Sequence, residues 1–261
     1  MQQHFYGWRP DTPDQRDILY CAVPSVPVPA DLDLRPEQPP VFDQGQLGSC
    51  TGNGIAGELE AQALMQGLPL SVLSRLFIYY NERVIEHTVT EDSGASIRDG
   101  IKSVATQGVC PESEWPYKIS KFAVKPPKQC YTDALKFRAL TYRSVPRSTS
   151  TAWALNTIKS ALATARGIVF GISVYESFES DAVAKSGIVP MPAKSEQMLG
   201  GHCVRLVGFT DHGYPDIPAG HFIGCNSWGT GWGKSGYFAL PYAYVTNPNL
   251  ASDLWVVNGV S

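Results

Sequence analysis

The chain carries little charge and no long apolar run. Of its 261 residues, 17% are charged and the formal net charge is −3, and no basic run offers an electrostatic footprint for nucleic acid. No segment reaches the roughly 18 consecutive apolar residues that are needed to cross a bilayer. The N-terminus also lacks the charged-then-apolar pattern of a secretory signal. We therefore expect a cytoplasmic protein with no nucleic-acid or membrane partner, unless a removed leader directed it to secretion.

Three separated segments carry the residue types of thiol catalysis. Cys50 ends the stretch Gln44-Gly-Gln-Leu-Gly-Ser-Cys, His202 follows two glycines, and Asn226 begins Asn-Ser-Trp-Gly-Thr-Gly-Trp-Gly. A thiol is a strong nucleophile only as a thiolate, and it needs an imidazole to take its proton and later protonate the leaving amine. A third group must hold the tautomer and orientation of that imidazole, and an Asn side-chain carbonyl can do so.

Each of these segments, taken alone, also has a purely structural explanation. A lone cysteine is more often a small buried hydrophobe than a nucleophile. A histidine within a strand can be a satisfied core residue, and a segment rich in Asn and Gly can be turn chemistry. Because all three segments occur in the expected order, with a glutamine six residues before the cysteine, the joint pattern favours catalysis.

The joint pattern resembles that of papain-like cysteine peptidases of a short bacterial-type branch, from about Leu32 to the C-terminus. Leu47 stands where the family has a first cysteine, and Thr51 stands where it has an aromatic residue. The resemblance implies an α+β fold of two subdomains with a catalytic cleft between them. A helical left subdomain is expected over about 39–130 and a β-barrel-like right subdomain over about 131–261.

The resemblance also implies a role for each motif residue in a cysteine endopeptidase. Cys50 would be the nucleophile, and His202 would be the base, poised as an imidazolium beside the thiolate at rest. Asn226 would orient the imidazole, and Trp228 would shield that hydrogen bond from water. The side-chain amide of Gln44 would face the developing oxyanion together with the Cys50 backbone N–H.

The substrate-binding residues follow from the same resemblance. Gly94 and Ala95 lie in Ser-Gly-Ala-Ser, at the position of a loop that pairs with the backbone of an extended peptide. Gly201 would form the opposite wall of the cleft. Ile172 would line the pocket for the second residue before the scissile bond and favour apolar side chains there. The expected partners are peptide or protein substrates and proteinaceous cysteine-protease inhibitors, and the chain is expected to be a monomer.

Residues 1–38 are predicted to form an extended N-terminal arm. Its prolines exclude helix interior, and the run from Val23 to Ala30 favours polyproline II. Phe5, Tyr6 and Trp8 are too apolar for a solvated tail, so they are expected to pack on the body of the protein. Family zymogens are held inactive by a pro-segment that crosses the cleft, and this arm is long enough to cross it. A structural arm packed away from the active site is the alternative.

Hydrophobic periodicity and turn residues predict the regular elements. Apolar residues at Ile55, Leu59 and Ala63 predict a helix that starts near Cys50. Further helices are expected over 71–86, over 95–107 with Gly108 as C-cap, and from an N-cap at Ser150 or Thr151 to Gly167. Strands are expected over 168–175, 203–209, 221–225, 237–240 and 254–257.

The other five cysteines predict neither a complete disulfide framework nor a metal site. With Cys50 reserved as a free thiol, five remain, an odd number that cannot all pair internally. Cys110 and Cys130 could pair, but sequence cannot place their Cα atoms within bridging range, and reduced thiols are expected. No pair or cluster of His and Cys has the spacing of a zinc site, so no metal and no cofactor is expected.

Two further functions are compatible with the same motif. An acyl transferase could use the same thiol triad, because transfer of the acyl group to an amine proceeds through the same acyl-enzyme as hydrolysis. A non-catalytic binding module of the same fold would be expected to have lost Cys50, His202 or Gln44, and all three are present.

Overall fold

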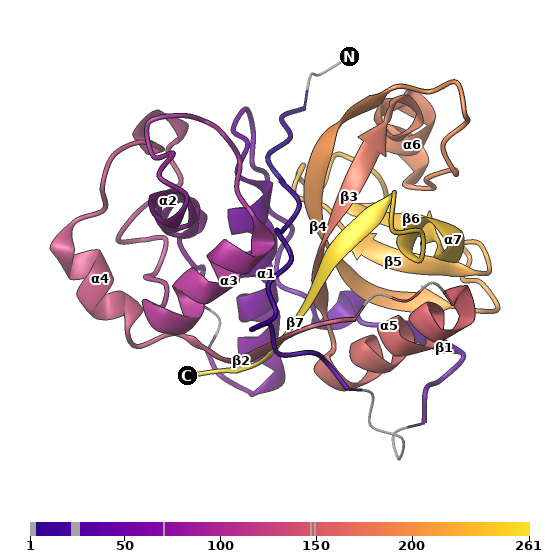
Figure 1. Ribbon diagram of the computed structural model, residues 1–261, viewed down its shortest axis with the longest axis horizontal. Coiled ribbons are helices and arrows are strands. Elements are labelled where there is room, and N and C mark those ends of the chain that lie inside the picture. Colours follow the sequence, from indigo (N-terminus) through magenta and orange to yellow (C-terminus); the bar gives the residue numbers. More distant parts are fainter. Residues whose placement is uncertain (1–3, 22–26, 70, 147, 149) are drawn as a thin grey trace.

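The computed structural model describes residues 4–21, 27–69, 71–146, 148 and 150–261, and it shows a helical half beside a sheet half (Figure 1). The first half of the predicted polyproline segment, residues 23–26, lies outside the described residues. An indigo N-terminal segment runs in front of the helix at the centre, between the two halves (Figure 1). Among the described residues, no helix has the length and apolarity to cross a membrane.

The helical half contains three longer helices and one short helix, packed around the apolar cluster that includes Leu59, Phe77 and Ile101. The central helix is buried over most of its length, which explains why its sequence is rich in small residues. Its elements are α1 (Cys50–Met65), α2 (Arg75–Ile85), α3 (Ile97–Thr106), η2 (Ile119–Lys121) and α4 (Lys128–Ala134), while η1 (Arg35–Glu37) precedes α1 in the chain and binds Asp216 of the other half through Arg35.

The other half is built on one antiparallel sheet with strand order β2-β7-β3-β4-β5-β6, and β1 pairs with β4. The strands are β1 (Asp31–Asp33), β2 (Ala139–Ser144), β3 (Ile168–Tyr175), β4 (Met198–Thr210), β5 (His221–Cys225), β6 (Tyr237–Pro241) and β7 (Ala251–Val260). The helical elements of this half are α5 (Thr151–Ala165), η3 (Glu176–Glu179), α6 (Asp181–Ser186) and α7 (Tyr242–Val245).

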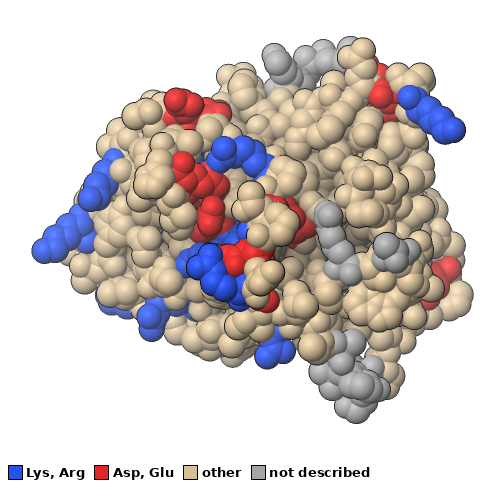
Figure 2. All heavy atoms as spheres, in the orientation of Figure 1, with Lys and Arg blue, Asp and Glu red and all other residues tan. Residues whose placement is uncertain are grey.

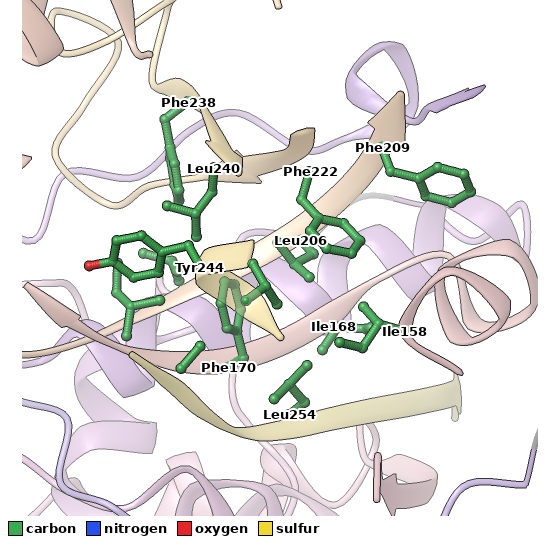
Figure 3. Packing of buried hydrophobic residues seen from close by; sticks show 14 of the residues in the cluster. Ile158, Ile168, Phe170, Leu206, Phe209, Phe222, Phe238, Leu240, Tyr244 and Leu254 are labelled. Atoms are coloured by element: carbon green, nitrogen blue, oxygen red, sulfur yellow. The ribbon is translucent and has the colours of Figure 1, made fainter. Parts of the chain in front are cut away.

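The sheet half has its own core. Phe170, Leu206 and Phe222 from three neighbouring strands pack together with Ile158 from α5 and Tyr244 from α7 (Figure 3). Burial of aromatic and branched side chains of this kind contributes about 1.5–3 kcal/mol for each side chain. The sheet is therefore a rigid platform for the residues that its strands carry toward the helical half.

Small residues on α1 allow the two halves to approach closely. A β-carbon on Gly54 would lie 3.1 Å from Cys203 Sγ of β4, and one on Gly52 would lie 2.7 Å from the carbonyl oxygen of Arg75. The first glycine faces the sheet and the second faces α2. Gly54 therefore permits close packing between the halves, and Gly52 permits close packing of α1 against α2.

Several predicted boundaries are confirmed and others are shifted. Ser150 caps α5, because its side chain accepts a hydrogen bond from Trp153 N, but the helix ends with Arg166 in the left-handed conformation, before the predicted Gly167. The predicted 71–86 helix begins only at Arg75, since the Ser74 side chain caps it by accepting from Phe77 N. Gly108 follows the C-cap residue of α3 and takes a positive φ of 77°.

The end of the predicted arm is part of the body. Asp31, Leu32 and Asp33 pair with residues 208–210 of β4 as the edge strand β1. Further upstream, the Tyr20 backbone N–H donates to the carbonyl of Ser144 on β2 at 2.8 Å. The arm is therefore fixed to the sheet at two places besides the segment that runs between the halves.

Candidate active site

Cys50 is the first residue of α1 and lies fully buried between the halves. The positive end of the helix dipole favours a thiolate at this position. Burial has the larger effect, and it raises the pKa of the Cys50 thiol to about 12, although the backbone amides of Cys203 and Gly7 act in the opposite direction. The thiol is therefore neutral at physiological pH in this structure.

His202 lies on β4 and faces a residue that follows the neighbouring strand. Its Nε2 is 2.8 Å from Oδ1 of Asn226, which comes directly after β5. The indole of Trp228 stacks on the imidazole with ring centroids 4.8 Å apart and covers this hydrogen bond. Among the described residues, Nδ1 of His202 has no hydrogen-bond partner, so this nitrogen is left to exchange a proton with a reacting group.

Burial beneath the arm disfavours the imidazolium that was expected for His202 at rest. Burial lowers the pKa of its imidazole to about 4, although the hydrogen bond to Asn226 raises it and the charge of His4 lowers it further. Together with the raised pKa of Cys50, this favours a neutral thiol and a neutral imidazole. The cause is the exclusion of water, and the N-terminal segment contributes to that exclusion.

Gln44 holds its amide toward a carbonyl group of the N-terminal segment. Its Nε2 donates to the carbonyl oxygen of Phe5 at 3.1 Å and to that of Leu47 at 2.9 Å. Its Oε1 accepts from the Ser227 hydroxyl at 2.6 Å, which fixes the orientation of the amide. A peptide carbonyl therefore already occupies the position in front of the group expected to face the oxyanion.

The backbone of the N-terminal segment pairs with both walls of the cleft. Ala95 N donates to Gly7 O at 2.7 Å, and Arg9 N donates to Ala95 O at 3.0 Å, so the two chains form a parallel bridge. On the opposite wall, Trp8 N donates to Gly201 O at 2.9 Å. The arm therefore lies between Ala95 and Gly201, two residues that were predicted to bind substrate through their backbone groups. Gly94, also predicted to bind substrate, precedes Ala95 in the chain.

Aromatic side chains of the same segment cover the site. His4 stacks on Trp228 with ring centroids 3.7 Å apart, and Tyr6 meets the edge of the His202 ring at 6.2 Å. Both His4 and Tyr6 hydrogen-bond to Glu179, at 2.6 Å for His4 Nδ1. These contacts place the arm over the imidazole from the side of Trp228.

Trp8 fills a pocket beside the nucleophile. A β-carbon on Gly171 would lie 2.0 Å from the Trp8 ring, and one on Gly201 would lie 2.4 Å from the Trp8 carbonyl oxygen, so the indole rests where two glycines leave room. Its Nε1 donates to Oδ2 of Asp253 at 3.1 Å. Ile172, predicted to line a pocket, is buried in the core of the sheet half, and its neighbour Gly171 faces the cleft.

Ion pairs fix the arm beyond the cleft. Arg98 on α3 binds the carboxylate of Asp17 at 2.5 Å and the carbonyl oxygen of Thr12 at 2.5 Å, and Arg9 pairs with Glu86. Figure 2 shows basic and acidic side chains interleaved at the middle of this face. These polar contacts join successive residues of the arm to the helical half.

A groove of about 660 Å³ lies next to the covered site, on the side of Trp228. It is lined by residues of both halves, including Asp43, Glu179 and Asp181. The arm therefore fills the part of the cleft over Cys50 and leaves the adjoining part open.

Sequence reasoning missed two residues of this site, Asp253 and Glu179. Asp253 lies in β7, which was predicted only as a strand, and it binds arm residues more than 240 positions away in sequence. Glu179 lies in η3, for which no element was predicted. An acidic residue inside an otherwise apolar strand was the one available signal, and it applies to Asp253 alone.

Comparisons with known proteins point to one protein family. The sequence pattern of the papain family cysteine proteases matches residues 28–254 of the chain. An uncharacterised peptidase C1-like protein of Acanthamoeba polyphaga mimivirus is 40% identical over 277 residues, which cover 98% of this chain and 87% of that protein.

Solved structures show the same fold. The crystal structure of xylellain, a cysteine protease from Xylella fastidiosa, is similar with a TM-score of 0.89 and 39% identity, over 98% of this chain and 96% of that one. A digestive procathepsin from the larval midgut of Tenebrio molitor shares the fold at a TM-score of 0.71 with 20% identity, over 94% of this chain and 74% of that one. These neighbours confirm the predicted α+β, papain-like fold.

Proposed function

Because the chain belongs to the papain family of cysteine proteases, we propose that Cys50, His202 and Asn226 carry its peptide hydrolysis. In the first step the Cys50 sulfur attacks the peptide carbonyl while His202 holds the thiol proton. The tetrahedral intermediate then collapses, His202 protonates the leaving amine, and a thioester remains on Cys50. Water activated by His202 hydrolyses that thioester and restores the thiol. Asn226 keeps the imidazole oriented throughout, through the 2.8 Å hydrogen bond to Nε2.

The observation that carries this proposal is the hydrogen bond from Gln44 to the carbonyl oxygen of Phe5. It shows that a peptide carbonyl fits in front of the Gln44 amide while the chain passes over Cys50. The backbone N–H of Cys50, at the start of α1, is the second donor proposed for the oxyanion. Donors of this kind contribute on the order of 10²–10³ in rate elsewhere.

We further propose that the N-terminal arm is autoinhibitory. Residues 4–9 of the arm occupy both walls of the cleft, cover His202 and exclude water from Cys50. A substrate cannot pair with Ala95 and Gly201 while the arm holds them. The arm is tethered, so its effective concentration is on the order of millimolar, and modest contacts suffice to keep it docked.

Two variants test the proposal. Cys50→Ala should abolish hydrolysis of a fluorogenic peptide without changing the melting temperature. A variant that lacks residues 1–28 keeps β1 and should show higher activity for each titrated active site than the full chain. Addition of the arm as a free peptide should reverse that rise.

Two results would contradict the proposal. Equal turnover by Cys50→Ala, with contaminating protease excluded, would remove the assignment of the nucleophile. Unchanged activity for each titrated site after removal of residues 1–28, at a normal melting temperature, would remove the autoinhibitory role of the arm. Product analysis with and without an added amine separates hydrolysis from acyl transfer.

A further inference from the structure

Two cysteines outside the cleft lie together with their side chains buried. The sulfur atoms of Cys110 and Cys130 and a carboxylate oxygen of Glu114 all lie within 4.8 Å of one another. Cys110 follows α3, and its carbonyl accepts from Ser74 N at 2.9 Å, at the start of α2. Cys130 lies in α4. Neither thiol takes part in the hydrolysis proposed above, and both are free in this structure.

The segment between these cysteines supports the catalytic loop. Its Tyr117 hydroxyl donates to the carbonyl oxygen of Gln44 at 2.9 Å and shares a 2.5 Å hydrogen bond with the hydroxyl of Ser49, the residue before Cys50. The guanidinium of Arg75 lies 4.0 Å above the Tyr117 ring. Residues 111–129 therefore hold the segment that carries the oxyanion donor and the nucleophile.

We propose that Cys110 and Cys130 are a thiol pair that a small disulfide oxidant of the glutathione class converts into an intramolecular disulfide. One cysteine sulfur attacks the oxidant, forms a mixed disulfide and releases one reduced thiol. The second cysteine sulfur then attacks the mixed disulfide and releases the other. In total, two protein S–H bonds and one oxidant S–S bond are lost, and one protein S–S bond and two oxidant S–H bonds are formed.

The surroundings of the pair permit this reaction. A cavity of about 210 Å³ lies close to the pair, and its lining includes Glu114 together with Val109 and Pro111, the two neighbours of Cys110 in sequence. Cys130 is 2% exposed and Cys110 is fully buried, so Cys130 is the sulfur that reacts first. The helix that carries Cys130 has 7 residues and no side-chain cap, so a small shift of α4 can bring the sulfurs to bonding distance.

The disulfide would close a loop over residues 110–130 and tie α4 to the start of α2. A cross-link of this length restricts the unfolded chain, and we expect a rise in melting temperature of roughly 5–10 °C. Because Tyr117 lies within the closed loop, the amides of residues 44–50 should also exchange hydrogen more slowly in the oxidised protein.

The experiment uses the full chain with Cys50→Ala, so that the active-site thiol cannot react. The protein is equilibrated in buffers of reduced and oxidised glutathione, quenched with an alkylating agent, and measured by intact mass, peptide mapping and thermal unfolding. The expected result is the loss of two hydrogens, a linked peptide pair that contains Cys110 and Cys130, and the higher melting temperature. Cys21→Ser, at an exposed cysteine, should leave all three results unchanged.

Cys110→Ser and Cys130→Ser, each in the Cys50→Ala background, should abolish the linked peptides and the rise in melting temperature. If one variant fails to fold, the other gives the same answer. Thiols that stay free or carry only glutathione in the most oxidising buffer would overturn the proposal. Bound Zn²⁺ that protects both thiols until a chelator is added would also overturn it, in favour of a metal site that includes Glu114.

Discussion

Gly7 of the arm lies against Gly48, two residues before the nucleophile, so closely that a β-carbon on Gly7 would fall 1.7 Å from the Gly48 carbonyl oxygen. The clash would be with backbone, which cannot rotate away as a side chain can. On its other side the Gly7 carbonyl accepts from Ala95 N at 2.7 Å. Only glycine therefore lets the arm pass over the catalytic loop while it is paired with the cleft wall.

Gly7→Ala should release the arm from the cleft. The methyl group cannot coexist with the backbone pairing of Gly7 and Trp8, and the loss of two or three hydrogen bonds weakens docking by on the order of ten-fold or more. The activity of the full chain toward a small peptide should rise toward that of the variant that lacks residues 1–28. Gln15→Ala, at an exposed position of the same arm, should leave activity unchanged. Equal activities of Gly7→Ala and the unmodified chain would contradict this account of the contact.

Asp11 makes docking of the arm depend on pH. Burial raises the pKa of its carboxyl to about 6, and the nearby charge of Asp253 adds to this, while the hydrogen bond from Trp255 opposes it. A raised pKa means that the docked arm binds this proton more tightly than the released arm. Docking is therefore strongest at low pH and weakens as pH rises from about 4 to about 6, by roughly 100-fold.

The ratio of full-chain activity to that of the variant without residues 1–28 should rise over this pH range. Asp11→Asn should flatten the part of the rise that Asp11 causes. Asp14→Asn is the matched control, because the guanidinium of Arg16 lowers the Asp14 pKa far below this range. An unchanged slope in Asp11→Asn would show that other contacts of the arm set the pH dependence.

Much of the sheet half could be read from the sequence, because local signals coincide with its boundaries. β3 was predicted at its observed limits, since a β-branched run lies between Gly167 and the polar residues of η3. β2 was missed because half of its residues are exposed and only Ala139 is buried, and the strand is held instead by pairing with β7. α4 was missed because a helix of 7 residues after two prolines lacks a periodic pattern.

The candidate site was only partly predictable, for a different reason. Motif residues can be read from sequence, but both faces of β3 are buried, so no alternation shows whether Gly171 or Ile172 faces the cleft. The raised pKa of Cys50 and the lowered pKa of His202 both follow from burial between halves and beneath the arm. Such burial arises from contacts between residues that are distant in sequence, so no local sequence pattern predicts it.

Asn226→Ala should be milder than loss of the nucleophile. The imidazole of His202 loses its hydrogen bond at Nε2 but still stacks on Trp228, so it is misoriented rather than free. In the variant without residues 1–28 we expect kcat to fall by about 10²-fold, the effect of a small misplacement of a catalytic group. Steady-state kinetics check this, and a loss as complete as that of Cys50→Ala would show that Asn226 does more than orient the imidazole.

Release of the arm should change the charge state of the catalytic pair. Hydration removes the main cause of the raised pKa of Cys50 and the lowered pKa of His202, so a thiolate and an imidazolium can form together. The kcat/KM of the variant without residues 1–28 should be bell-shaped in pH, with both limbs belonging to the coupled pair. Its acid limb should lie well below the pKa of a free cysteine, about 8.5. A single rise near that value would mean that no such pair forms.

Gly171→Ala should affect both the docking of the arm and the binding of substrate. The three atoms nearest to a β-carbon at this position all belong to the Trp8 ring, so the substitution should disturb the arm and leave the sheet intact. In the full chain the methyl group displaces Trp8, and activity should rise. Asp253 lies beside the pocket that Trp8 leaves, and its carboxylate can accept a hydrogen bond from a substrate group there.

In the variant without residues 1–28, the pocket should therefore favour substrates with a large aromatic or basic side chain at the position that enters it. Gly171→Ala should lower kcat/KM for a tryptophan-containing peptide relative to its alanine analogue by roughly 10- to 100-fold, the usual effect of one methyl group in a tight pocket. Asp253→Asn should weaken the preference for a basic side chain and leave the aromatic one largely unchanged. If Gly171→Ala activates the full chain but leaves the peptide preference unaltered, Trp8 occupies a pocket that substrates do not use.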